Sequence, residues 1–230
     1  MSSQLKTPRA TYRLQFHRDF TLRDAQALVP YLDALGVSHV YASPLLTARK
    51  GSPHGYDGCD PTRLNPELGT ETDLESLVRA LHERGMGLVL DIVPNHLAAS
   101  PENPWWWNVL QLGPASAYAN YFDIEWHLPD PLLNGKVLLP VLGDELERVL
   151  ERNELKVVCE GDEVVVRYYD HRFPVSPGSL VVPEKTPAEA VASFNASRDA
   201  MAVFLKQQHY CLAFWRHGNT RINYRRFFNI

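Results

Sequence analysis

The stretch at residues 88–96 constrains the fold of this chain more than any other. It reads Leu-Val-Leu-Asp-Ile-Val-Pro-Asn-His, an apolar run that holds one carboxylate, Asp91, and ends at Pro94. Such a run is typical of a parallel strand buried on both faces, and proline ends it because it has no N–H to donate. A buried ionised carboxylate needs a partner. We therefore predict a functional site at the carboxyl end of this strand; the alternative is an aspartate satisfied by backbone donors.

The residues before this stretch predict a βαβαβ pattern. Strands are expected at 11–16 and 37–41, and a helix between them at 22–35. A second helix is expected to start at a capping box formed by Thr72 and Glu75 and to end near Gly85. Crossovers of this kind are right-handed and give parallel strands. Long loops in compact units are usually either functional or disordered. The polar segment at 43–71 is expected to be an ordered loop, because it contains aromatic and apolar anchors.

After this stretch the pattern changes. The three tryptophans at 105–107 are expected in a short helical piece, packed as a hydrophobic plug rather than stacked on a sugar. Runs with β pattern at 136–142 and 155–169, the second with a hairpin turn at 161–162, indicate an inserted subdomain with antiparallel strands. A capping box starts a helix at residue 186, and helical periodicity continues to 216.

Three parallel strands and an insertion leave unpaired sheet edges and are too few to close a barrel. Either further strands lie outside this chain or the fold is a small open sheet. The apolar, abrupt ending at Ile230 favours a partial sequence.

Composition limits the class of protein. The chain has 230 residues, 45% of them hydrophobic and 22% charged, as expected for a globular protein. The net charge of −4 argues against binding to nucleic acid or an anionic membrane surface. We find no apolar run long enough to span a membrane and no secretory signal. Three widely spaced cysteines fit reduced thiols, so we expect a cytoplasmic protein.

Several short motifs resemble one known family. The Asp91-x-x-x-Asn95-His96 pattern resembles the first conserved region of the α-amylase superfamily, glycoside hydrolase family 13. Within that superfamily the chain resembles the maltooligosyltrehalose synthases. The matching pieces, in chain order, are Thr-Tyr-Arg-Leu-Gln-Phe at 11–16, Tyr-Ala-Ser-Pro-Leu at 41–45, Gly-Ser-Pro-His-Gly-Tyr-Asp at 51–57, Asp-Pro at 60–61 and Ile-Asn-Tyr-Arg-Arg-Phe-Phe at 222–228.

The resemblance implies the first three βα units of a (β/α)8 TIM barrel, with an α+β subdomain inserted after the third strand. The corresponding parts are 1–98 for the barrel, 99–185 for the subdomain and 186–230 for a helical segment returning to the barrel. It also implies a reaction in which the reducing-end α-1,4 link of a maltooligosaccharide becomes an α,α-1,1 link. This is a retaining intramolecular transglucosylation from which water must be excluded.

The resemblance also implies roles for single residues. Tyr56 matches a tyrosine that stacks on the sugar ring at the cleavage subsite. His96 matches a histidine that hydrogen-bonds a hydroxyl of that sugar. Asp91 matches a supporting aspartate that holds neighbouring side chains rather than attacking. Asn95 matches a residue that shapes the following loop.

Other assignments remain open. His54 and Asp57 are either subsite residues or residues that structure the loop. The pair Arg225 and Arg226 is expected to be solvated or structural rather than to reach the site. We expect no metal, because nothing else builds an oxygen cage around Asn95, and no cofactor.

The family's nucleophile motif, Arg-x-Asp, is absent from this sequence. We therefore expect no isomerase activity from the chain alone. The alternatives are another α-amylase-type hydrolase or transglucosylase, and a non-catalytic glucan-binding fragment. A metal-hydrolase cluster of Asp57, Asp91 and His96 is disfavoured because it lacks a further His or Cys ligand.

Overall fold

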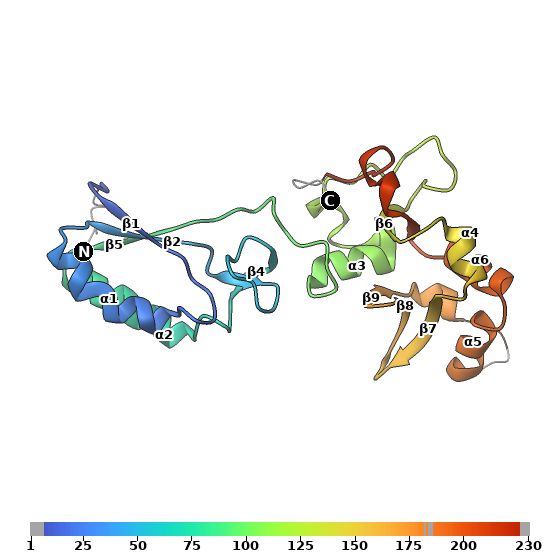
Figure 1. The fold of residues 1–230 in the computed structure, drawn as a ribbon, viewed down its shortest axis with the longest axis horizontal. Coiled ribbons are helices and arrows are strands. Elements are labelled where there is room, and N and C mark those ends of the chain that lie inside the picture. The colour runs from blue at the N-terminus through green and yellow to red at the C-terminus, as the bar shows by residue number, and fades with distance from the viewer. Residues whose placement is uncertain (1–6, 182, 184–185, 226–230) are drawn as a thin grey trace. The chain divides into compact units, whose positions relative to one another are not determined.

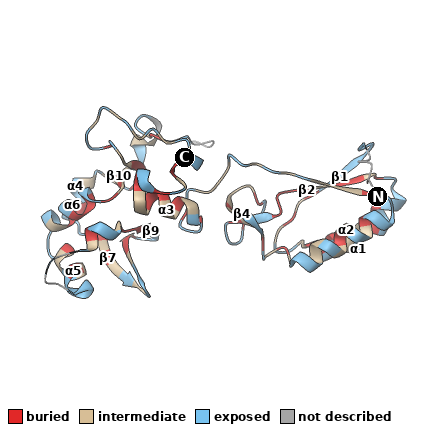
Figure 2. Cartoon of the chain, turned by 180° about the vertical axis from the view of Figure 1, so that it is seen from behind, coloured by how far each residue is buried: buried red, intermediate tan, exposed pale blue. Residues whose placement is uncertain are grey.

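The computed structural model describes residues 7–181, 183 and 186–225, which form two compact units. The first unit ends at Asn103 and the second begins at Pro104 (Figure 1). Both contain helices and strands, which confirms the predicted α/β class. Each unit has its own buried apolar core, seen as separate red segments in Figure 2.

The first unit is built on a three-stranded parallel sheet. Its strands lie in the order β1 (Thr11–Leu14), β2 (His39–Ala42) and β5 (Gly87–Leu90). Helices α1 (Leu22–Ala34) and α2 (Glu71–Glu83) connect them and pack against each other, as Figure 1 also shows. The predicted βαβαβ pattern is therefore confirmed.

The register of this sheet separates its two faces. Arg13 lies opposite Tyr41, and Tyr41 lies opposite Val89. Side chains alternate along a strand, so Asp91, two residues after Val89, is expected to share their face. The neighbouring positions Leu14 and Val40 are buried in the core with the two helices. Polar groups thus gather on the face away from the helices.

The third strand is shorter and more exposed than predicted. Strand β5 ends at Leu90, so Asp91 follows the strand instead of lying inside it. Leu90 is 51% exposed and Ile92 is 67% exposed. The prediction of a strand buried on both faces is wrong for these residues, because β5 is an edge strand that pairs with β2 on one side only, and it ends at Leu90, before Ile92.

Two further expectations for this unit need correction. The polar segment 43–71 holds a small antiparallel sheet of β3 (Leu46–Ala48) and β4 (Gly58–Leu64). Its pairing shifts register twice, which hid the strand pattern in the sequence. The capping box of α2 is formed by Thr70 and Asp73 rather than by residues 72 and 75. An aspartate thus takes the place of the glutamate that we expected.

The second unit contains a pair of parallel strands, an antiparallel sheet and helices. The sheets are β6–β10 and β7–β8–β9. The strands are β6 (Val137–Leu142), β7 (Leu155–Glu160), β8 (Glu163–Tyr168), β9 (His171–Pro174) and β10 (Tyr210–Phe214). The α-helices are α3 (Pro104–Leu112), α4 (Leu146–Glu151), α5 (Pro187–Phe194) and α6 (Arg198–Lys206). The 3-10 helices are η1 (Gly113–Ala115), η2 (Ala119–Tyr121), η3 (Pro177–Leu180) and η4 (Trp215–Asn219).

Several local predictions for this unit are confirmed. Glu160 pairs with Glu163 across a two-residue turn, in which Gly161 has a positive φ of 59°. Thr186 caps α5 through a capping box with Glu189. The tryptophans at 105–107 lie in α3; Trp106 is 3% exposed within the core, as a packed plug requires, whereas Trp105 and Trp107 are half-buried.

The helical return segment predicted for 186–230 is wrong in part. Helices α5 and α6 are followed by strand β10, which pairs with β6 in parallel. Tyr210 and Leu212 are buried and alternate with less buried neighbours, a period-two pattern that competed with the helical one. Residues 226–230 lie outside the described part of the chain. The boundaries 1–98, 99–185 and 186–230 stay a prediction.

Candidate functional site

The carboxyl ends of the three parallel strands bring four side chains together. Arg13 comes from β1, Tyr41 from β2 and Asp91 from the residue after β5. Tyr56 comes from the loop between β3 and β4. Because parallel strands end at one edge of a sheet, the fold itself concentrates these polar groups.

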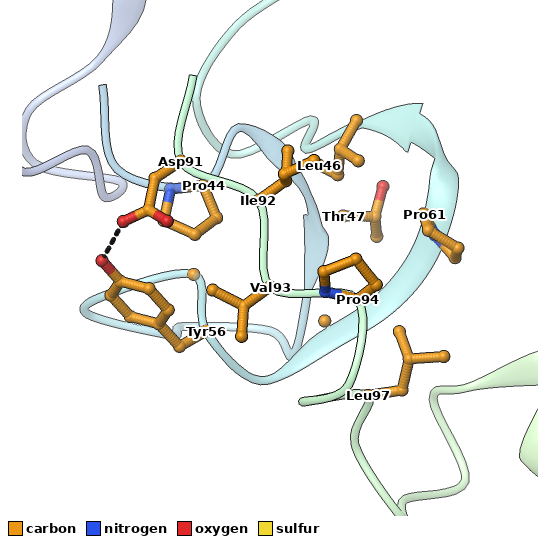
Figure 3. A pocket seen from close by; sticks show the side chains of 12 residues that line it. Pro44, Leu46, Thr47, Tyr56, Pro61, Asp91, Ile92, Val93, Pro94 and Leu97 are labelled. Carbon is orange, nitrogen blue, oxygen red and sulfur yellow. Dashed lines mark hydrogen bonds between the residues drawn. The ribbon is translucent and has the colours of Figure 1, made fainter. Parts of the chain in front are cut away.

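The Asp91 carboxylate is the centre of their hydrogen bonds. Its Oδ2 accepts from the hydroxyl of Tyr56 at 2.5 Å and from the hydroxyl of Tyr41 at 2.9 Å. The Tyr56 hydroxyl in turn accepts from Nη2 of Arg13 at 2.9 Å. Figure 3 shows the phenol of Tyr56 pointing at the carboxylate. Two tyrosine side chains therefore donate to the aspartate. The alternative expectation, that backbone N–H groups alone would satisfy it, is wrong.

The electrostatics of this network fix two protonation states. The hydrogen bond to Asp91, together with burial, raises the pKa of Tyr41 above its usual value. The hydrogen bond to Tyr56 raises the pKa of Arg13. At neutral pH the Tyr41 phenol therefore stays neutral and donates, and the guanidinium stays charged.

Tyr56 and Asp91 also line a pocket of about 180 Å³. The rest of its wall is mainly apolar and comes from the segments that follow β2 and β5, from strands β3 and β4 and from the loop between them (Figure 3). The apolar lining residues are Pro44, Leu46, Pro61, Ile92, Val93, Pro94 and Leu97. An apolar pocket with a few convergent polar groups is the usual form of a small-molecule site.

The loop that carries Tyr56 is held by its own polar side chains. The Ser52 hydroxyl donates to Oδ1 of Asp57 at 2.5 Å and accepts from the backbone N–H of Gly55 at 3.1 Å. The N–H of Tyr56 donates to Nδ1 of His54 at 3.0 Å. Since this nitrogen accepts, its 3.8 Å separation from Asp57 is not a hydrogen bond. His54 and Asp57 thus structure the loop.

Gly55 lets this loop approach the end of strand β2. Its φ is +74°, and a Cβ at this position would lie 2.8 Å from the carbonyl oxygen of Pro44. A larger residue would be strained there and would clash with backbone. The glycine therefore sets where Tyr56 stands at the pocket.

Two carboxylates fasten the start of the same loop. Glu102 accepts from the N–H of Lys50 at 2.7 Å, and Glu67 accepts from the N–H of Gly51 at 3.0 and 3.1 Å. These contacts order residues 49–57, as expected for a functional loop rather than a mobile one.

The structure places Asn95 and His96 beside each other, between Pro94 and Leu97 of the pocket wall. Nδ1 of His96 lies 2.9 Å from Oδ1 of Asn95, and the N–H of His96 donates to the carbonyl of Val93. Neither residue is among those that line the pocket, and neither are His54 and Asp57. Of the predicted site residues, Tyr56 and Asp91 alone share the cavity.

Sequence reasoning missed two members of the network. Arg13 and Tyr41 lie inside matching motifs but received no role. Each stands one residue before the end of a parallel strand, on the face away from the helices, a position that becomes clear only once the strand bounds and pairing are known. Arg225 forms an ion pair with Asp123 at 3.1 Å in the second unit, and Arg226 lies outside the described residues.

Two further features are absent from the described residues. No three His, Cys, Asp or Glu side chains there gather as a metal-binding group. No helix in the described ranges has the length and apolar character to cross a bilayer.

Comparison with known proteins gives matches over most of the chain. The catalytic-domain profile of the α-amylase family matches residues 24–184. A protein of Mycobacterium tuberculosis H37Rv named as a maltooligosyl trehalose synthase is 44% identical over 228 residues, which is 96% of this chain and 26% of the relative. The α-amylase SusG of Bacteroides thetaiotaomicron is 36% identical over 109 residues, 47% of this chain and 15% of the relative.

Solved structures agree with these matches. The maltooligosyltrehalose synthase of Arthrobacter ramosus superposes with a TM-score of 0.77 at 43% identity, covering 97% of this chain and 26% of that one. The chain thus spans about a quarter of the length of these synthases.

Proposed function

This chain belongs to the α-amylase family, and on that premise we propose that its Tyr56–Asp91 pocket binds a glucosyl unit of an α-1,4-glucan. One observation carries the proposal: a phenol and a carboxylate, joined at 2.5 Å, stand at the edge of an apolar pocket at the strand ends. An aromatic ring suits the apolar face of glucose, and polar groups beside it suit the hydroxyls.

The proposed reaction is that of a maltooligosyltrehalose synthase. The reducing-end α-1,4 link of a maltooligosaccharide is broken and re-formed as an α,α-1,1 link, without net hydrolysis. The identity of 43–44% to two such proteins along nearly the whole chain supports this choice over other members of the family.

The residues of this chain would bind and orient substrate rather than cleave the link. Tyr56 would stack on the sugar ring, and Asp91 would hold the Tyr56 and Tyr41 hydroxyls in place. Retaining chemistry needs two carboxyls roughly 5–5.5 Å apart, one as nucleophile and one as acid. The sequence has no Arg-x-Asp motif, so we assign neither role here.

The remaining predicted site residues support this pocket from its surroundings. His96 would hydrogen-bond a hydroxyl of the same sugar, and Asn95 would fix the imidazole through their contact at 2.9 Å. His54 and Asp57 would order the loop that presents Tyr56. The cytoplasmic location stays a prediction.

We further propose that the first unit is part of a (β/α)8 barrel. Its strands stand side by side in chain order, and both crossover helices pack on one face, as in a singly wound barrel. The exposure of Leu90 and Ile92 fits an edge at which a further strand would pair.

A chimera tests the proposed reaction. This chain replaces the matching segment of the Arthrobacter ramosus synthase, and the product is incubated with maltopentaose. We expect maltotriosyl trehalose, identified by the α,α-1,1 signal in NMR, and none of it from the 230-residue chain alone. Formation of glucose, maltose or maltotriose without any trehalose linkage would instead favour a hydrolase, and the native synthase serves as the control.

A further inference from the structure

Arg13 on strand β1 makes contacts that neither the matching motifs nor the family likeness assign a role. Its Nη2 donates to the Tyr56 hydroxyl at 2.9 Å, and its Nη1 donates to Oε1 of Gln15 at 2.7 Å. The guanidinium carbon lies 5.8 Å from the ring centroid of Tyr41. One side chain thus touches both tyrosines that donate to Asp91.

We propose that Arg13 is the positioning residue of the pocket, which sets the direction of the Tyr56 hydroxyl and the plane of its ring. The inference rests on the proposed function, in which the Tyr56 ring meets a sugar. It adds a residue that does not line the cavity itself.

The hydrogen-bonding capacity of a phenol explains the effect. The Tyr56 oxygen has one proton to give, and a guanidinium has only donors. Because Arg13 occupies a lone pair of that oxygen, the proton is left to point at Oδ2 of Asp91. The ring is thereby held at its tip between a cation and a carboxylate, and charge-assisted bonds of this kind are the strong ones.

Gln15 extends this support to the backbone of the Tyr56 loop. Its Nε2 donates to the carbonyl of Pro53 at 3.1 Å, while its Oε1 accepts from Arg13. Strand β1 and the residue that follows it therefore hold the loop at two places, at the hydroxyl of Tyr56 through Arg13 and at the main chain of Pro53 through Gln15. A lysine at position 13 would keep the charge but lose the planar fork that serves both acceptors.

The first test measures the ¹³Cζ chemical shift of Tyr56, which reports on its hydroxyl, in the absence of substrate. The 230-residue chain is labelled with ¹³Cζ-tyrosine, and the Tyr56 signal is assigned with Tyr56→Phe. The unaltered chain is then compared with Arg13→Met, Arg13→Lys and the exposed control Arg9→Met. We expect the Tyr56 shift to change in Arg13→Met, to return part of the way in Arg13→Lys, and to stay unchanged in the control. A Tyr56 shift that is the same in Arg13→Met as in the unaltered chain overturns the proposal.

Arg13→Lys also covers the case in which Arg13→Met does not fold, because a Tyr56 shift unaltered in the lysine variant overturns the proposal equally. The chimera with the Arthrobacter ramosus synthase supplies a second readout. Arg13→Met should raise the KM for maltopentaose about tenfold with a smaller change in kcat, and Arg13→Lys should recover part of it. An unchanged KM contradicts the proposal.

The two readouts separate the two claims. If the unaltered chimera forms no trehalose linkage, the proposed function fails, and the NMR comparison still decides the role of Arg13. If the chimera is active and the Tyr56 chemical shift is the same with and without the Arg13 side chain, the positioning role of Arg13 is wrong, and the proposed function still stands.

Discussion

The hydroxyl of Tyr56 lies between a guanidinium and a carboxylate, and this single group connects strand β1, the loop at residues 49–57 and the residue after β5. Its ring lines the pocket while its oxygen belongs to the network. Ring and hydroxyl can therefore be tested separately by substitution.

In the chimera, we expect Tyr56→Phe to lower kcat/KM for maltopentaose about tenfold, because the charge-assisted hydrogen bonds are lost. Tyr56→Ala should lower it about 100-fold, because the stacking face is lost as well. Steady-state kinetics measure both. Tyr31→Phe and Tyr31→Ala, on an exposed face of α1, are the matched controls. Equal effects of Tyr56→Phe and Tyr56→Ala would show that the ring is not a stacking surface.

At the residue scale, the sequence pointed to Asp91 and Tyr56 and missed their partners. Asp91 stood out because an acid interrupts an apolar run, and Tyr56 because of its motif. Arg13 and Tyr41 were hidden because a strand of four residues gives no sign of which face meets a distant loop. The roles of His96 and Asn95 in sugar binding stay a prediction.

Among the elements, helix α2 shows how a start signal can be misplaced by two residues. Both Thr70 and Thr72 have an acid three residues later. The hydroxyl of Thr70 accepts from the N–H of Asp73 at 3.2 Å, and Oδ2 of Asp73 accepts from the N–H of Thr70 at 2.8 Å. A cap is defined by extended backbone before the first turn, which sequence spacing does not reveal.

This difference predicts unequal effects of two similar substitutions. Thr70→Ala should lower the free energy of unfolding by about 1 kcal/mol, because it removes the cap. Thr72→Ala, at an exposed position in the first turn, should change it by less than about 0.5 kcal/mol. Urea unfolding of both variants measures this, and the reverse order would place the helix start at residue 72.

The same cap makes stability depend on acid pH. A hydrogen bond from Arg23, with those from Thr70, lowers the pKa of Asp73 to about 2. A depressed folded-state pKa gives stability that is fully present above the unfolded value near 4 and is lost as the pH falls toward 2. The urea midpoint should therefore fall between pH 4 and pH 2, and less steeply in Asp73→Asn. Identical slopes for the two proteins would contradict the assignment.

Elements with sustained periodicity were predicted well, and those with irregular pairing were not. Helix α1 and the β7–β8 hairpin follow one period throughout. Strands β3 and β4 were missed because register shifts break their alternation, and β10 resembled helix because its five residues follow a helical run. The pairing partner β6 lies about 70 residues earlier and is invisible to local patterns.

On the scale of the whole molecule, each unit depends on long-range contacts that no local pattern predicts. In the second unit the buried side chain of Asn223 accepts from the N–H of Leu138 at 2.9 Å. It also donates to the carbonyls of Glu125 and Lys136 at 2.9 and 2.8 Å. One amide thus joins three segments of chain.

Asn223→Ala should lower the free energy of unfolding by about 2–3 kcal/mol, because buried backbone groups lose their partners. Asn120→Ala, at an exposed position of the same unit, is the control, with an expected change within about 0.5 kcal/mol. Denaturant unfolding measures both, and the amide of Leu138 should exchange faster in Asn223→Ala. An unchanged exchange rate would mean that other groups satisfy this amide.

The most direct measurement for the molecule as a whole is an NMR titration of the 230-residue chain with maltopentaose, with cellopentaose as the β-linked control. The Ile92 and Leu97 methyl groups and the Tyr56 ring line the pocket and report on it together. We predict that these three signals shift with maltopentaose along one binding curve and respond less to cellopentaose. Signals that stay fixed in millimolar maltopentaose, or that move equally with both sugars, would contradict the claim that this pocket holds an α-1,4-glucan.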